Sequence, residues 1–151
     1  MRIICVRTGT KYDSWWEHNL KHMIDKYSGL KYDEFVVIKE NLYELQVANK
    51  LIMFDKYRSG QNIYFDLDMV IKGDCNKFLT DELTVCRAWW RDAWHTPLNS
   101  SIISWCGDYS HVFDKWNQDP EYYMTKYHKG IDQYFYEDIK PMTYQEGYCS
   151  Y

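Results

Sequence analysis

Two aspartates, Asp66 and Asp68, end the apolar run in the segment NIYFDLDMVIKGD, and their types and spacing suit metal chemistry. In an extended segment alternate side chains point the same way, so the two carboxylates are expected to share one face. Carboxylates that converge repel each other unless a cation lies between them, and Mg²⁺ or Mn²⁺ favours such oxygen ligands. The simpler alternative is a polar loop after a strand, because Asp-x-Asp recurs by chance in acidic loops.

Hydrophobic patterns before the aspartates predict the elements that would position them. Apolar runs predict strands at residues 3–6, 34–38 and 62–65, and helical spacing of apolar residues predicts helices near 14–27 and 43–57. Strand, helix, strand, helix, strand is typical of an α/β domain with a largely parallel sheet, in which ligands bind beyond the carboxyl ends of the strands. The turn after the first strand and the Asp-x-Asp segment both fall at such ends.

The second half of the sequence is less regular. Apolar runs predict strands at 83–90 and 100–105, and helical patterns occur near 109–116, 121–128 and 131–137. No repeat, low-complexity stretch or linker divides the 151 residues, so we expect a single domain.

Composition argues against several classes of protein. The net charge of −4 includes no block of like charges, so the sequence has no electrostatic footprint for nucleic acid. No stretch approaches about eighteen consecutive apolar residues and no signal-peptide pattern follows Met1, so we expect no transmembrane segment and a cytoplasmic location. The five cysteines are scattered and form no Cys-x-x-Cys pair, which indicates neither a disulfide framework nor a zinc site.

Five short segments carry a family resemblance: CVRTGTKYDSWWEHNLKHMI, ANKLIMFDKY, NIYFDLDMVIKGD, LNSSIISW and GIDQYF. In this order they resemble nucleotide-sugar glycosyltransferases of the GT-A fold, including small bacterial, viral and glycogenin-like members, and they span nearly all of residues 1–151. The resemblance implies a minimal-length GT-A domain, a Rossmann-like α/β fold with a mostly parallel central sheet flanked by helices. It also implies metal-dependent transfer of a sugar from a nucleotide diphosphate sugar, expected to be a UDP-sugar, to an acceptor hydroxyl on a glycan, lipid-linked sugar or protein.

The resemblance assigns roles to residues that match these segments. Asp66 and Asp68 would hold Mn²⁺ or Mg²⁺ against the donor diphosphate, where the ion acts as a Lewis acid on the departing nucleotide. Lys50 would reach the donor phosphates or sugar, although a lysine stem lying on the core is the alternative. The first strand-to-helix turn would receive the base and ribose. Its matching residues are Thr8, Gly9, Thr10 and Tyr12, of which Tyr12 offers a ring for stacking.

Two later segments would face the sugar. Asn99 and Ser100 match a stretch that lines the donor-sugar pocket, where an amide and a hydroxyl can bond sugar hydroxyls. Asp132 and Gln133 match a pair that faces the sugar or the acceptor, and Asp132 is the expected catalytic carboxylate or sugar-hydroxyl acceptor. Both residues of this pair could instead lie on a solvated helix face.

A further metal ligand is commonly a histidine from a later segment of the family, and none is expected after Tyr151 in this chain. The metal would then rely on the two aspartates, water and the donor phosphates, since such ions often keep several waters. We therefore expect metal and nucleotide to bind cooperatively. His128, near the Asp132 and Gln133 pair in the sequence, is the first candidate for a third protein ligand of the metal.

Two other classes of function stay open. A nucleotidyl or phosphoryl transferase also uses paired aspartates and a divalent ion, but the sequence has no P-loop or kinase signature. A nucleotide-sugar-binding module, with transferase activity that has lapsed or depends on a partner, is the non-enzymatic alternative. A homo-oligomer is compatible with each of these functions.

Overall fold

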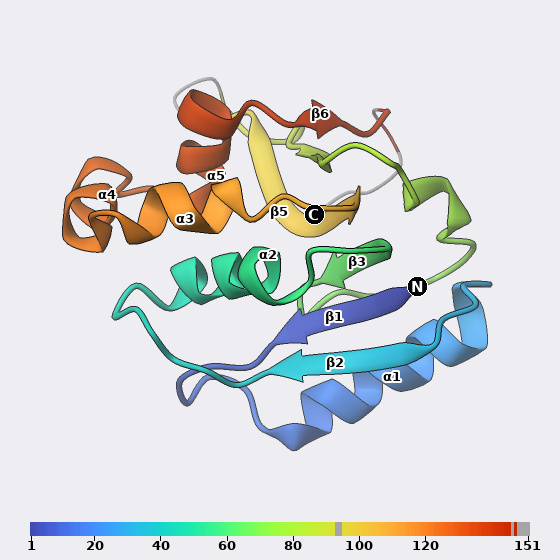
Figure 1. Cartoon of the computed structure of the whole chain (residues 1–151). Helices are drawn as coiled ribbons and strands as arrows, with labels where there is room; N and C mark the ends of the chain where they lie inside the picture. Colours follow the sequence, from blue (N-terminus) through green and yellow to red (C-terminus); the bar gives the residue numbers. More distant parts are fainter. Residues whose placement is uncertain (93–94, 146, 148–151) are drawn as a thin grey trace.

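The sheet organises the molecule in this computed structural model, which describes residues 1–92, 95–145 and 147. Within them six strands form one sheet in the order β2-β1-β3-β5-β4-β6 (Figure 1). The strands are β1 Arg2–Val6, β2 Glu34–Ile38, β3 Gln61–Phe65, β4 Thr84–Arg87, β5 Leu98–Cys106 and β6 Met142–Thr143. β1 is parallel to β2 and β3, and β4 is parallel to β6, whereas β5 is antiparallel to β3 and β4. The predicted α/β fold with a mostly parallel sheet is confirmed.

Helices cover both faces of this sheet (Figure 1). They are α1 Ser14–Tyr27, the 3₁₀ helix η1 Gln46–Leu51, α2 Ile52–Lys56, the 3₁₀ helix η2 Asn76–Phe78, α3 His111–Asn117, α4 Pro120–Lys126, α5 Ile131–Tyr134 and the π-helix η3 Phe135–Ile139. Helix α1 packs on one face together with the segment around η2, and helices α2, α3 and α5 pack on the other. The carboxyl ends of β1 and β3 therefore lie between two covered faces.

Alternation along the strands explains the two cores. In β1, Ile3 belongs to the cluster that contains Leu20 and Ile24 of α1, whereas Ile4 belongs to the cluster of α2, α3 and α5. Successive strand residues point to opposite faces, so a continuous apolar run suits a strand buried on both sides. This is why β1, β2 and β3 match the predicted ranges within one residue.

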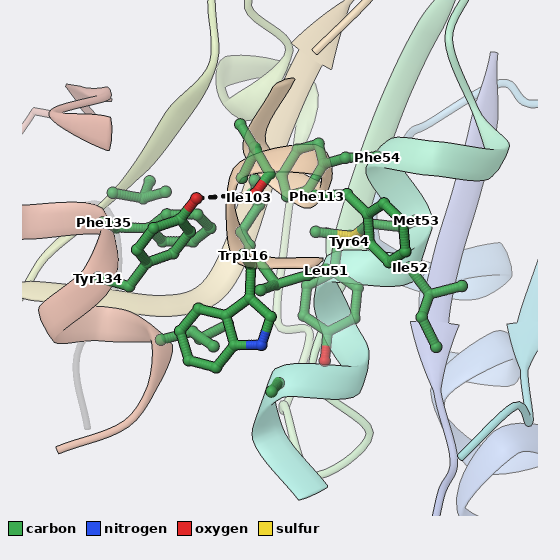
Figure 2. Packing of buried hydrophobic residues seen from close by; sticks show 14 of the residues in the cluster. Leu51, Ile52, Met53, Phe54, Tyr64, Ile103, Phe113, Trp116, Tyr134 and Phe135 are labelled. Carbon is green, nitrogen blue, oxygen red and sulfur yellow. Dashed lines mark hydrogen bonds between the residues drawn. The ribbon is translucent and has the colours of Figure 1, made fainter. Parts of the chain in front are cut away.

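Aromatic side chains build the larger core and fix the position of α5. Tyr134 of α5 packs edge-on against Trp116 of α3, with ring centroids 5.1 Å apart, and Phe135 follows it into the same cluster (Figure 2). The Tyr134 hydroxyl donates a hydrogen bond of 2.8 Å to the Val112 carbonyl. Helix α5 is therefore held firmly at its apolar side.

The predicted helix over 43–57 is only partly correct. Its first part is the 3₁₀ helix η1 and only the last five residues of the helical stretch form α2. The buried side chain of Asn49 explains the late start, because its Oδ1 accepts from the backbone N–H groups of Leu42 and Tyr43. Side-chain bonds of this kind offer the backbone an alternative to a helix.

Candidate functional site

Asp66 is the first residue after β3, and its half-buried carboxylate organises the polar groups around it. One oxygen, Oδ1, accepts a hydrogen bond from the Tyr64 hydroxyl and lies 2.6 Å from Lys50 Nζ. The Asp66 backbone N–H donates to the Ser101 carbonyl at 2.9 Å. Burial alone would raise the pKa of Asp66, but the charge and hydrogen bond of Lys50, with hydrogen bonds from Tyr64 and Ser101, bring that pKa below its ordinary value. The carboxylate therefore carries its charge at neutral pH.

Asp68 lies in a turn that begins directly after the strand. The Asp66 carbonyl accepts a hydrogen bond of 3.2 Å from the Met69 N–H, so the segment between them is not extended. The prediction that alternation places both carboxylates on one face is wrong in its reasoning, because alternation ends where the turn begins. The Asp68 side chain is half exposed, accepts a hydrogen bond from the Tyr12 hydroxyl and lies 3.7 Å from Lys11 Nζ.

The loop between β1 and α1 brings Tyr12 to Asp68. Gly9 in this loop has a φ of +69°, and a Cβ there would approach the Gln46 side chain to 3.0 Å, so both backbone and space favour glycine. Thr8 is half-buried and Thr10 is exposed on either side of it. Tyr12 also meets Trp16 edge-on, with ring centroids 5.2 Å apart, which fixes its ring between α1 and the aspartate.

A chain of polar contacts leads from Asp66 into the second half of the sequence. Lys50 Nζ lies 3.4 Å from both the carbonyl oxygen and Oγ of Ser100. The Ser100 N–H donates to Asp132 Oδ1 at 2.9 Å, and Asp132 Oδ2 accepts from Arg91 Nη1 at 3.0 Å. We call these five residues the inner network. We call Asp68, Tyr12 and Lys11 the outer group.

The structure joins four of the predicted site residues in the inner network, although they are widely separated in sequence: Lys50, Asp66, Ser100 and Asp132. Asn99 stands beside them at the start of β5, where its Oδ1 accepts from the Ser101 N–H at 3.0 Å. Gln133 turns elsewhere, because its Nε2 donates to Glu137 Oε1 at 2.7 Å. The predicted neighbours Asp132 and Gln133 therefore have different surroundings.

Sequence reasoning missed three residues that contact the predicted ones. Tyr64 stands two residues before Asp66, and alternation along the strand was a signal that could have found it. Lys11 precedes Tyr12 in the predicted nucleotide turn and reaches Asp68. Arg91 lies in a loop and had no signal in the sequence, since its partner is forty-one positions away.

The donor set suits a hard divalent ion that keeps much of its water. Among residues 1–92, 95–145 and 147, no group of three or more His, Cys, Asp or Glu side chains could hold a metal ion. Mg²⁺ and similar ions commonly bind through one or two carboxylates plus substrate phosphates, and Asp66 and Asp68 are the carboxylates that follow β3. Asp66 already pairs with the Lys50 ammonium, so an ion that binds there has to displace or share that contact.

A cavity of ≈ 850 Å³ opens beside Asp68. Its walls come from the segment between β3 and η2, including Met69, Val70 and Lys72, and from Ser101 and Ile102 of β5. A small molecule or part of a larger one fits in this volume next to the outer group.

In the described part of the chain, no helix is long and apolar enough to cross a membrane.

Comparisons with known proteins give a structural relative. No family model matches the sequence, and no curated protein matches it. The fold is similar to the crystal structure of the apo-form glycosyltransferase GlyE of Streptococcus pneumoniae TIGR4, with a TM-score of 0.61 and 10% sequence identity. The similarity covers 96% of this chain and 45% of that chain, so this chain spans less than half the length of GlyE.

Proposed function

We propose that this protein is a metal-dependent glycosyltransferase that moves a sugar from a UDP-sugar to an acceptor hydroxyl. The observation that carries the proposal is the inner network at the carboxyl end of β3, in which Lys50, Asp66 and Asp132 are linked through Ser100. These residues come from separate segments that resemble nucleotide-sugar glycosyltransferases. The structural similarity to the glycosyltransferase GlyE supports the same general reaction.

The proposed donor site combines the inner network with the outer group. Asp66 and Asp68 would hold Mn²⁺ or Mg²⁺, which as a Lewis acid would polarise the donor diphosphate. Lys50 would exchange its contact with Asp66 for one with the donor phosphates, since an ammonium binds phosphate as a point charge. Tyr12, with Thr8, Gly9 and Thr10 in its loop, would hold the base and ribose.

The sugar would lie toward the start of β5 and α5. The Asn99 amide would bind sugar hydroxyls, and the neighbouring Ser100 would support the sugar site through its contacts with Lys50 and Asp132. Asp132 would either accept a hydrogen bond from a sugar hydroxyl or assist the reacting centre as a carboxylate. Gln133, which bonds Glu137 in this structure, would need another rotamer to reach the same sugar.

A nucleotide-sugar-binding module without turnover is the second candidate. The observation that favours it is the contact between Lys50 and Asp66, because a carboxylate already neutralised by an ammonium resists metal. This candidate shares the donor-binding site and lacks the transfer. A measurement of turnover beside binding therefore separates the two.

The first test measures nucleotide-sugar binding with and without metal. Thermal unfolding in a panel of UDP-sugars should show a Tm gain that requires Mn²⁺, of about 5–10 °C at a hundred times Kd, because a ligand stabilises the folded state by mass action. Asp68→Asn should abolish the metal-dependent part of the gain and leave the fold intact. Calorimetry that finds the same metal-dependent affinity in this variant would contradict the assignment.

Asp25→Asn is a matched control. Asp25 also accepts hydrogen bonds from a tyrosine, Tyr32, and a lysine, Lys21, on an exposed surface, but it lies on α1 away from the end of β3. Its replacement should leave the metal-dependent Tm gain unchanged. Conversion of a UDP-sugar to free UDP in the same samples then distinguishes a transferase from the binding module.

A further inference from the structure

Asp132 is held by two separate segments. Its Oδ1 accepts from the backbone N–H of Ser100, and its Oδ2 accepts from the Arg91 guanidinium. The Asp132 side chain is 14% exposed and that of Arg91 20% exposed, so the pair is largely shielded from water. A carboxylate with both oxygens committed has little freedom of rotation, and its orientation depends on the two donors.

Arg91 is itself anchored to the loop that leads into β5. Its Nη1 lies 2.7 Å from the Leu98 carbonyl and 3.2 Å from Thr96 Oγ1, in addition to its contact with Asp132. The Thr96 hydroxyl is buried and lies 3.2 Å from the same carbonyl. The guanidinium therefore joins the loop before β5 to the start of α5 at one point.

We propose that Arg91 is a positioning residue that sets the orientation of Asp132 for sugar transfer, which rests on the proposed function. The Ser100 N–H fixes only one oxygen of the carboxylate, and Arg91 fixes the other. Without the guanidinium, Asp132 keeps only the hydrogen bond from Ser100 and its second oxygen is no longer held, so the orientation of the carboxylate toward the sugar is less well defined. A displacement of about 1 Å at a reacting group costs on the order of 100-fold in rate.

Arginine suits this position because its rigid planar group holds Nη1 at a fixed place. That one nitrogen lies within hydrogen-bonding distance of a carbonyl, a hydroxyl and a carboxylate, and it shares its two N–H groups among them. Lysine would keep the charge but offers a point donor on a flexible stem. Arg91→Lys is therefore expected to recover part of the function, and Arg91→Gln very little.

The test uses Mn²⁺ and the UDP-sugar that the wild-type protein turns over fastest among UDP-glucose, UDP-galactose and UDP-N-acetylglucosamine. Arg91→Gln should lower kcat on the order of 100-fold and leave KM for the donor and Kd for UDP within about twofold. Arg91→Lys should recover about tenfold of that loss. The decisive variant carries both Arg91→Gln and Asp132→Asn. It should be no slower than Asp132→Asn alone, because a residue that acts through another adds nothing once that one is lost.

Several outcomes would overturn the proposal. Unchanged kcat in Arg91→Gln, or losses from Arg91→Gln and Asp132→Asn that multiply in the double variant, would mean that Arg91 does not act through Asp132. A wild-type protein with no Mn²⁺-dependent binding or turnover of UDP-sugars would remove the proposed function, and the role of Arg91 with it, before any variant is compared. These two failures are distinct, because only the second affects the wild-type protein.

Two further variants provide a control and an alternative to Arg91→Gln. Arg58→Gln removes another arginine–aspartate pair, with Asp55, whose side chains are exposed, and should leave kcat unchanged. If Arg91→Gln does not fold, Thr96→Val removes one acceptor of Arg91 at nearly constant shape. It should lower kcat less than tenfold with KM unchanged, and an unchanged kcat in a folded Thr96→Val protein would count against the proposal.

Discussion

Asp66 of the inner network and Asp68 of the outer group each contact a lysine and a tyrosine, but in different surroundings. Asp66 with Lys50 and Tyr64 forms an inner trio, and Asp68 with Lys11 and Tyr12 forms an outer trio. The side chains of Lys50 and Asp66 are 12% and 22% exposed, whereas those of Lys11 and Asp68 are 75% and 49% exposed.

Burial decides what each trio can do. Solvent-exposed ion pairs contribute little to the free energy of unfolding. When one partner of a shielded pair is removed, the other is left as an unpaired charge in a poorly solvated place, which destabilises the fold. The inner trio is therefore expected to contribute to both the fold and the chemistry. The outer trio is open to solvent and beside the cavity, so its members are able to exchange partners for a ligand at small cost. Replacing equivalent members of the two trios tests this difference directly.

The largest expected contrast is between the two lysines. Lys50→Met should lower the free energy of unfolding by about 2–4 kcal/mol, because Asp66 is left half-buried without its partner. Lys11→Met should change it by less than about 0.5 kcal/mol, as for other exposed pairs. Chemical denaturation of the two variants measures both values. Equal losses would mean that the inner ion pair is no more important for stability than the outer one.

A second replacement identifies the cause of the loss. Adding Asp66→Asn to Lys50→Met removes the unpaired charge and should recover roughly half of the lost stability. A loss that persists in full would instead point to packing of the lysine stem against Tyr64, over whose ring Lys50 Nζ lies at 5.2 Å.

The same contrast explains which parts of the site could be predicted from the sequence. Lys50 and Asp66 stood out because each is a charged residue in or after an apolar run, and β1 to β3 were predicted well because continuous apolar runs suit strands buried on both sides. Arg91 could not be predicted, because a loop has no periodicity and its contact with Asp132 depends on how β5 and α5 pack. The turn after Asp66 was missed for a related reason: the end of the strand at Phe65 was predicted, but alternation says nothing about the backbone beyond that end.

The hydrogen bonds of one side chain explain why the helix predicted over 43–57 forms only in part. Helical spacing of Val47, Leu51 and Phe54 does not distinguish an α-helix from a 3₁₀ helix followed by an α-helix. The deciding residue is Asn49, whose amide also donates to the Tyr43 and Gln46 carbonyls. Such a network is visible only once the backbone has been placed.

The two tyrosines provide the second comparison. Burial, followed by the charge of Asp66, raises the pKa of Tyr64 well above its usual range, and burial with the Asp68 hydrogen bond raises that of Tyr12. A raised folded pKa gives stability that is present below the unfolded value of about 10 and is lost as pH rises through the folded pKa. The decline in unfolding free energy above pH 10 should therefore become shallower in Tyr64→Phe, and less so in Tyr12→Phe. Matching slopes in these two variants would contradict the difference in burial.

The smallest expected effect concerns how Asp66 changes the free energy of unfolding between pH 7 and 4. The sign of this contribution should be opposite in the wild-type protein and in Lys50→Met. In the wild-type protein the pKa of Asp66 is lowered, because Lys50 and the hydrogen bonds outweigh burial. A lowered folded pKa gives stability that is present above the unfolded value of about 4 and is lost as pH falls through the folded pKa.

Lys50→Met removes the main favourable cause and leaves burial, which raises the pKa of a carboxyl. The folded variant should then bind its proton before the unfolded chain does, so Asp66 makes the variant more stable, relative to wild type, as pH falls from 7 toward 4. The other carboxyls titrate alike in both proteins, so the difference between the two curves of unfolding free energy against pH isolates this one group. Lys11→Met should follow the wild-type curve throughout. If the Lys50→Met curve also ran parallel to wild type between pH 7 and 4, Asp66 would be solvated well enough to keep its charge without Lys50, and the distinction between the inner and outer groups would no longer rest on burial.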